Sequence, residues 1–260
     1  MRAYLRFAAL SLRTGISYST AIALGTLGRC FQLLATVAIW GALLANGGTL
    51  GGFDLPEMKA YLLVGFVVNV LGSTVGDWAM AQRIHSGMIA LDLVRPINYQ
   101  ATQFAATLGG VVLDLVVIVV AGGGFVLLAQ PIEAPQHWGL LLASLLLVVP
   151  LKFLIVYLST LICFYTQNYH GVFWAREAIW LLLSGAMVPL ALLPDAVQLI
   201  ASLLPFAAVM STPALIYLGK VSTADAVGLI AIQVGWVAGL WLVSRLAWRG
   251  ASRRLTVHGG

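Results

Sequence analysis

Residues 77–98 read DWAMAQRIHSGMIALDLVRPIN and interrupt an otherwise apolar chain. The segment carries four charged residues: Asp77, Arg83, Asp92 and Arg95. This density of charge prevents the segment from crossing the hydrocarbon core of a membrane. Its apolar residues nevertheless recur at helical spacing: Ile84, Met88, Ile89 and Leu91. The segment therefore predicts a short amphipathic helix at a membrane surface, placed between apolar stretches on either side.

The composition fixes the class of protein. Hydrophobic residues make up 61% of the 260 residues and charged residues only 9%, which is far outside the usual composition of a water-soluble domain. A membrane-spanning helix needs roughly 20 apolar residues, and six stretches qualify: Thr20–Ala45, Met58–Gly76, Ala101–Ala129, Trp138–Phe164, Phe173–Leu193 and Ala224–Arg245. These runs are too long and too continuous for the strands of a barrel. We predict an all-α integral membrane protein with six transmembrane helices, forming a single domain over residues 1–260.

The basic residues predict the orientation. Most arginines fall in segments that share one side when both termini are cytoplasmic: Arg2, Arg6, Arg13, Arg83, Arg95, Arg176, Arg245, Arg249, Arg253 and Arg254. The opposite side has only Lys59 and Lys220, and two basic residues lie inside spans. Positive residues accumulate on the cytoplasmic side, so we expect both termini there. The net charge of +5 then reflects insertion and contact with anionic lipid, and no nucleic-acid partner is expected.

Two segments are predicted to lie at the membrane without spanning it. Residues 1–19 alternate arginines with apolar residues, which is typical of an amphipathic helix in the interface. Residues 194–220 are apolar, but Pro194, Pro205 and Pro213 divide them into pieces too short to cross. We expect the second segment to form a pair of re-entrant helices on the outer side, covered by protein.

The chain lacks the motifs of an enzyme. None of its three lysines closes a nucleotide-binding loop of the Gly-x-x-x-x-Gly-Lys-Ser/Thr type. The four histidines are scattered over both sides of the membrane, which argues against a metal cluster. Cys30 and Cys163 both lie in predicted spans and are expected to be free thiols. We therefore expect no catalytic residues and no cofactor in this chain, and any ATP must bind to a separate subunit.

Three stretches carry a resemblance to a known family. Residues 83–98 match the pattern Ile-x-x-Gly-x-Ile-x-x-x-Leu-x-Arg-Pro, residues 184–190 read SGAMVPL, and Leu203–Phe206 is followed by Leu218–Lys220. Together with the six spans, these stretches resemble the type-2 permease family of ABC transporters, and in particular a bacterial group of drug-export or natural-product-export permeases. The resemblance covers essentially the whole chain. Val94 departs from it, because leucine is expected at that position.

The resemblance implies a function and its partners. It implies that residues 77–100 form a cytoplasmic coupling segment that docks on an ATP-binding cassette ATPase dimer, which holds ATP and Mg²⁺. It also implies a second permease chain, more often a different one, and export by alternating access across a bacterial inner membrane. The few polar residues favour an amphipathic or lipid-like compound or a peptide as cargo. The expected coupling residues are Arg83, Ile84, His85, Ser86, Gly87, Met88, Leu91, Asp92, Arg95 and Pro96.

The local chemistry agrees with a coupling role. Pro96 disfavours helical geometry at Arg95 and ends the helix, and Gly87 permits close approach of a partner backbone. Three residues are expected to form an apolar ridge facing the partner: Ile84, Met88 and Leu91. The charged residues of the segment could pair across the interface.

Two charges within the spans remain to be explained. Asp114 and Lys152 lie at similar depth in the third and fourth spans, where a central charge costs ~2.5–3.5 kcal/mol. They form either a buried ion pair or part of a translocation path. Arg29, in the first span, either joins them or extends toward the cytoplasmic interface. A different class of function, an ion-coupled secondary carrier that uses Asp114 and Lys152, stays open, although no inverted repeat is visible.

Overall fold

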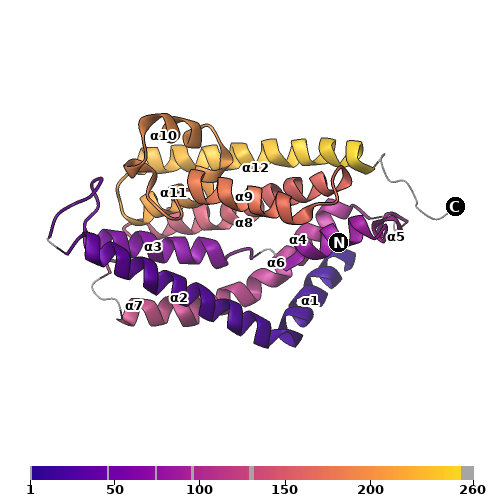
Figure 1. Ribbon diagram of the computed structural model, residues 1–260, viewed down its shortest axis with the longest axis horizontal. Coiled ribbons are helices and arrows are strands. Elements are labelled where there is room, and N and C mark those ends of the chain that lie inside the picture. The colour runs from indigo at the N-terminus through magenta and orange to yellow at the C-terminus, as the bar shows by residue number, and fades with distance from the viewer. Residues whose placement is uncertain (1, 46, 74, 95–96, 129–131, 253–260) are drawn as a thin grey trace.

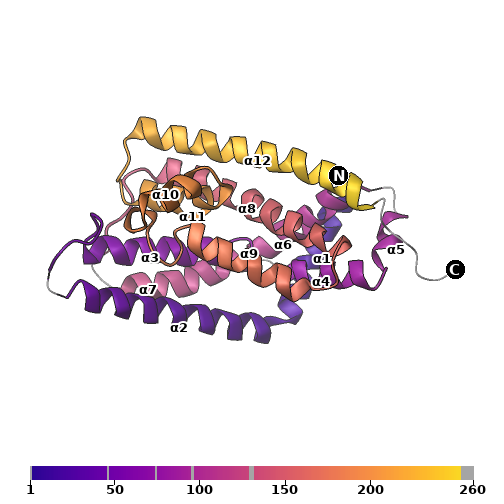
Figure 2. The same cartoon turned by 45° about the horizontal axis from the view of Figure 1, so that its top comes forward.

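The computed structural model describes residues 2–45, 47–73, 75–94, 97–128 and 132–252. Over these residues the regular elements are helices, and the one extended pairing is an isolated bridge between Leu50 and Phe53. The long helices lie side by side in an elongated bundle (Figure 1). We call the end that holds residues 86–98 and the end of the last helix the α5 end, and the opposite end, with residues 44–54, the loop end (Figure 2).

The helices follow one another along the whole described chain. They are α1 Arg2–Ser17, α2 Ser19–Leu43, α3 Leu55–Val70, α4 Val75–His85, α5 Ile89–Leu93, α6 Tyr99–Val117, a π-helical turn Ile118–Gly122, α7 Gly123–Leu128, α8 Trp138–Leu161 with a 3₁₀ turn Ile162–Phe164, α9 Tyr169–Leu183, a 3₁₀ turn Leu190–Leu192, α10 Asp195–Ser202, α11 Pro205–Tyr217 and α12 Thr223–Ser252. This all-helical content confirms the predicted class.

Four helical segments are long and apolar enough to cross a membrane. They are Ser19–Leu43, Tyr99–Leu128, Trp138–Phe164 and Thr223–Ser252, and they correspond to the predicted first, third, fourth and sixth spans. A fifth would be added if α10 and α11, which meet at an angle of 101°, were counted as one broken span. The chain is therefore a multi-pass membrane protein with four to five candidate spans.

The predicted second and fifth spans are shorter helices in the structure. α3 has 16 residues and α9 has 15, which corresponds to about 24 Å or less at 1.5 Å per residue, and the hydrocarbon core is ~30 Å thick. After α9 the chain leaves helical geometry, and residues 184–185 are tied to the bundle instead. The Ser211 hydroxyl donates to the Ser184 carbonyl at 3.0 Å, and the Tyr61 hydroxyl donates to the Gly185 carbonyl at 2.7 Å. Six full spans stay a prediction.

α8 lies at the centre of the bundle. Half of its most apolar stretch is buried, and it packs against α4, α6, α9, α11 and α12. The peripheral helix α2 is the opposite case, with 6% of its apolar stretch buried and large side chains such as Leu24, Leu27 and Phe31 exposed. Apolar surfaces of this extent mark contact with lipid or with a partner chain.

The predicted broken segment, residues 194–220, is found as α10 and α11. Pro194 precedes α10 and Pro205 begins α11, positions at which the missing proline N–H is not needed. The segment after α11 is fastened to the start of α3, because Lys220 forms an ion pair with Glu57 at 2.8 Å and donates to the Gly52 carbonyl at 2.7 Å. Glu57 also closes a capping box with Asp54 at the start of α3.

The predicted amphipathic segment, residues 1–19, contains α1. This helix packs along α6, and a Cβ added at Gly109 would overlap the backbone of Ala8, so a small residue is required at this crossing. The arginines of α1 point away from the bundle and are exposed: Arg2, Arg6 and Arg13. Its location in the membrane interface stays a prediction.

Candidate functional site

The predicted coupling segment, residues 77–100, forms two helices rather than one. α4 ends at His85, and a turn through Gly87 leads into α5. Gly87 has a φ of 72°, which is the left-handed region that glycine adopts readily and that commonly ends helices. Its N–H donates to the Ile84 carbonyl at 3.1 Å. No other atom lies within 4 Å of a Cβ added at Gly87, so the space outside the turn is open to a partner.

The turn changes which residues face outward. Ile84 was expected in the exposed apolar ridge, but it is buried in a cluster with Met80 and Ile89, so this part of the prediction is wrong. The exposed apolar residues are Met88, Leu91 and Val94, with 46%, 60% and 81% of their surface accessible. Helical periodicity does not continue through a left-handed turn, so α5 presents a face that the sequence of α4 could not predict. We call these three exposed residues the α5 ridge.

Arg83 and Asp92 brace the two helices against each other. The Arg83 Nε and Nη2 atoms donate to the two carboxylate oxygens of Asp92, both at 2.7 Å. This two-point pairing fixes the geometry as well as the charge. The hydrogen bonds to Asp92 raise the pKa of the Arg83 guanidinium above its ordinary value. In this chain the two residues therefore pair with each other across the turn.

The remaining predicted residues of the segment are distributed around the turn. His85 Nε2 lies 3.2 Å from the carbonyl oxygen of Thr166, in the connection after α8, and Ser86 is exposed. Arg95 and Pro96 lie outside the described residues. The turn is thus held from one side by the α8–α9 connection.

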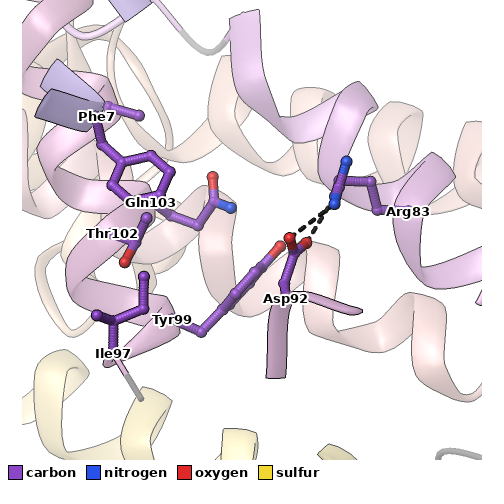
Figure 3. Close-up of a pocket in the computed structure, with 8 residues that line it drawn as sticks. Phe7, Arg83, Asp92, Ile97, Tyr99, Thr102 and Gln103 are labelled. Atoms are coloured by element: carbon purple, nitrogen blue, oxygen red, sulfur yellow. Dashed lines mark hydrogen bonds and ion pairs between the residues drawn. The ribbon is translucent and has the colours of Figure 1, made fainter. Parts of the chain in front are cut away.

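A cavity of about 290 Å³ lies beside the Arg83–Asp92 pair (Figure 3). Its walls come from α1, from the α4–α5 unit and from the first turns of α6. The lining residues are Phe7, Arg83, Asp92, Ile97, Tyr99, Thr102, Gln103 and Ala106. The sequence gave no indication of this cavity, because its walls come from distant parts of the chain.

The second notable feature is the break between α3 and α4. α3 ends at Val70, and Gly72 turns the chain with a φ of 65°. The Lys152 ammonium, on α8, donates to the carbonyls of Val68, Asn69 and Leu71 at 3.0, 2.9 and 2.9 Å. A cation is favourable at the C-terminal end of a helix, and these bonds satisfy carbonyls that the helix leaves unpaired.

Asp114, on α6, binds the other side of the same break. Its carboxylate accepts hydrogen bonds from the N–H groups of Gly72 and Ser73, at 2.9 and 3.1 Å, and from the Ser73 hydroxyl at 2.7 Å. We call the contacts of Lys152 and Asp114 with residues 68–73 the backbone clamp. Both charges are buried, but the described residues show no ion pair within 4 Å between them. The predicted direct ion pair is therefore corrected to two separate contacts with one broken helix.

Arg29 does not join the backbone clamp. It is half-buried in α2 and makes no hydrogen bond or ion pair with the part of the chain that the structure describes. It is close enough to Lys152 for the two cations to repel each other. Arg29 lies fourteen residues before Leu43 and Lys152 fourteen residues after Trp138. The two residues are thus at one level, about 21 Å from the loop end at 1.5 Å per residue.

A buried ion pair that the sequence did not reveal connects α4 with α9. Arg176 Nη2 lies 3.1 Å from the Asp77 carboxylate, and the side chains are 6% and 7% exposed. Arg176 also contacts Ser159 Oγ at 3.3 Å and Glu177 at 3.1 Å. The only sequence sign of this pair is one charge of each sign at the edge of an apolar stretch, 99 residues apart.

These features define a multi-pass helical membrane protein with a surface-exposed two-helix unit at one end. In the described part of the chain, no group of three or more potential metal ligands comes together. The chain belongs to the ABC-2 family transporter protein family, whose profile matches residues 31–259. No curated protein sequence matches it. Membership confirms the predicted type-2 permease resemblance and makes the chain an ABC-type membrane transport subunit, whose family associates with an ATP-binding cassette ATPase.

Proposed function

We propose that this chain is the permease subunit of an ABC exporter that moves an amphipathic or lipid-like compound, or a peptide, by alternating access. A separate ATPase dimer, holding ATP and Mg²⁺, supplies the energy. The observation that carries the proposal is the α5 ridge, which is apolar, exposed and located at the end of an ABC-2 family permease. Such a ridge on a short helix suits a groove on a partner surface.

The contacts of α4 give a route for force. A push on α5 reaches α4 through the two-point Arg83–Asp92 brace. α4 then acts on α9 through Asp77 and Arg176, and on α3 across the break that the backbone clamp holds. Movement of α4 against α3 and α9 is the kind of helix displacement that opens one side of a bundle and closes the other.

The three charges within the spans take different roles in this proposal. Lys152 and Asp114 hold the broken helix, whereas Arg29 lines the translocation path and receives an anionic group of the cargo. An ionisable residue inside a membrane calls for a partner, and Arg29 has none among the described residues. The alternative, an ion-coupled carrier using Asp114 and Lys152, is disfavoured because backbone groups already occupy both charges.

The exposed apolar helices support the remaining partners. α2 buries little of its surface, which leaves room for a second permease chain as well as lipid. We propose a heterodimer with a different permease, in a bacterial inner membrane, with both termini and the α5 end in the cytoplasm. The arginines exposed on α1 support this orientation.

The test is reconstitution with the ATPase and the second permease. Leu91→Glu places a charge on the α5 ridge, and Leu50→Glu places the same charge on an exposed leucine at the loop end as a matched control. We expect Leu91→Glu to abolish co-purification of the ATPase and cargo-stimulated ATP hydrolysis, and Leu50→Glu to retain both. Full stimulation in Leu91→Glu would rule out the α5 ridge as the docking surface.

A further inference from the structure

The cavity beside the Arg83–Asp92 pair has the make-up of a ligand site. Its volume of about 290 Å³ is close to the lower limit for small-molecule pockets. One wall is apolar and consists of Phe7, Ile97 and Ala106, whereas the other holds the ion pair, Tyr99 and Gln103 (Figure 3). A cavity with one apolar and one polar wall suits a molecule that is itself amphipathic.

The Tyr99 hydroxyl is the clearest sign of a missing partner. The side chain is 7% exposed, and its hydroxyl makes no hydrogen bond with the described residues. The ring cannot turn away easily, because it stacks on Trp248 with the centroids 4.7 Å apart and the planes within 6°. Buried hydroxyls almost always have a protein, water or ligand partner, so this one calls for an acceptor in the cavity.

Further donors surround the same space. The Asp92 carboxylate occupies Nε and Nη2 of Arg83, so the guanidinium, which has five N–H groups, keeps donors for a second acceptor. Figure 3 shows the Gln103 amide directed into the space between it and the ion pair. Asp92 is neutralised by Arg83, so it does not exclude an anion. The unused donors, of Arg83, Tyr99 and Gln103, fit an acceptor-rich group such as phosphate.

α1 connects the cavity to the membrane surface. Its residue Phe7 forms part of the apolar wall. The same helix exposes Leu5, Leu10 and Ile16 together with its arginines, a composition typical of helices that lie in the lipid interface. Exposed arginines there attract anionic lipids.

We propose that this cavity binds the headgroup of an anionic glycerophospholipid. The phosphate accepts hydrogen bonds from Arg83, Tyr99 and Gln103, and the first acyl carbons lie on Phe7 and Ile97. The lipid would link α1 to the α4–α5 unit. Because lipid binding is measured on this chain alone, the inference does not depend on the proposed ATPase partner.

The experiment is native mass spectrometry of the full chain, purified in detergent and incubated with lipids of identical acyl chains. Phosphatidylglycerol and phosphatidylcholine are the two probes. We expect wild-type protein to retain about tenfold more phosphatidylglycerol, since a charged hydrogen-bond set readily supplies one factor of ten. Tyr99→Phe and Gln103→Leu, singly and together, should remove most of this preference. Tyr157→Phe is the matched control, because its hydroxyl is also buried and unpartnered but lies outside the cavity.

Three results would overturn the proposal. Equal retention of the two lipids would show that the headgroup is not recognised, and equal loss in Tyr157→Phe would show a general packing effect. Displacement of the lipid by soluble glycerol 3-phosphate at equal concentration would show a site for a free phosphate ester instead. Thermal unfolding of each variant guards against misfolding, and Gln103→Leu alone decides if Tyr99→Phe does not fold.

Discussion

Replacing Lys152 by methionine should destabilise the protein strongly and in a way that distinguishes the backbone clamp from an ion pair. The ammonium makes three hydrogen bonds of 2.9–3.0 Å to carbonyls at the end of α3. Hydrogen bonds to charged groups contribute roughly 1.5–3 kcal/mol each, but the desolvation of the buried ammonium offsets part of this sum. We expect a loss of about 3–5 kcal/mol in the free energy of unfolding, the range for breaking a buried charged contact.

The exchange of the two charges gives the sharper result. In Asp114→Lys combined with Lys152→Asp, a carboxylate would face the carbonyls of residues 68–71, and an ammonium would face the N–H groups of Gly72 and Ser73. Both contacts become unfavourable, so the double variant should be no more stable than Lys152→Met. A direct ion pair would behave in the opposite way, because exchanging its charges preserves the attraction.

The assay is denaturant unfolding of the purified chain in detergent micelles, followed by tryptophan fluorescence. Asp114→Asn is a milder companion variant, because an amide oxygen still accepts a hydrogen bond from Ser73, and it should lose less than Lys152→Met. If the charge exchange restores most of the stability lost by Lys152→Met, the reasoning from separate backbone contacts is refuted.

Three further predictions concern the other features. Gly87→Ala should destabilise the turn by about 1–2 kcal/mol in thermal unfolding, because φ is positive there, and Gly87→Asn should cost less; equal stability of Gly87→Ala and wild type would contradict the assigned turn. Arg176→Met should cost about 3–5 kcal/mol by leaving Asp77 buried and unpaired, with much of the loss recovered when Asp77→Leu is added; the same unfolding titration measures this, and no recovery would show that the pair is not coupled. Arg29→Gln should change stability by less than about 0.5 kcal/mol, as for residues without partners, but should reduce transport of an anionic cargo relative to a neutral analogue; an unchanged ratio would remove Arg29 from the path.

Hydropathy predicted the parts of the fold that depend on composition alone. The four long helices, α2, the continuous α6–α7 segment, α8 and α12, coincide with predicted spans because each is a continuous run of more than 20 mostly apolar residues. The shortness of α3 and α9 was not predictable in this way. A glycine such as Gly72 ends a helix only when the backbone turns there, and glycines are common within membrane helices.

The site shows the same division between composition and geometry. Counting residues correctly placed Asp114 and Lys152 at one level, but it could not reveal their partners, because those partners are backbone groups without a sequence signature. The outward face of the coupling segment was misjudged at Ile84, since one left-handed residue, Gly87, resets the helical phase. The Asp77–Arg176 pair was missed because it joins residues 99 positions apart.

Site-specific photo-cross-linking from the α5 ridge tests the central claim most directly. A photoreactive amino acid at Leu91 in the assembled, ATP-hydrolysing transporter should cross-link to the ATP-binding subunit, and the same amino acid at Leu50, at the loop end, should not. If Leu91 yields no cross-link to that subunit while the complex hydrolyses ATP and transports cargo, the α5 ridge is not where this permease receives its driving force.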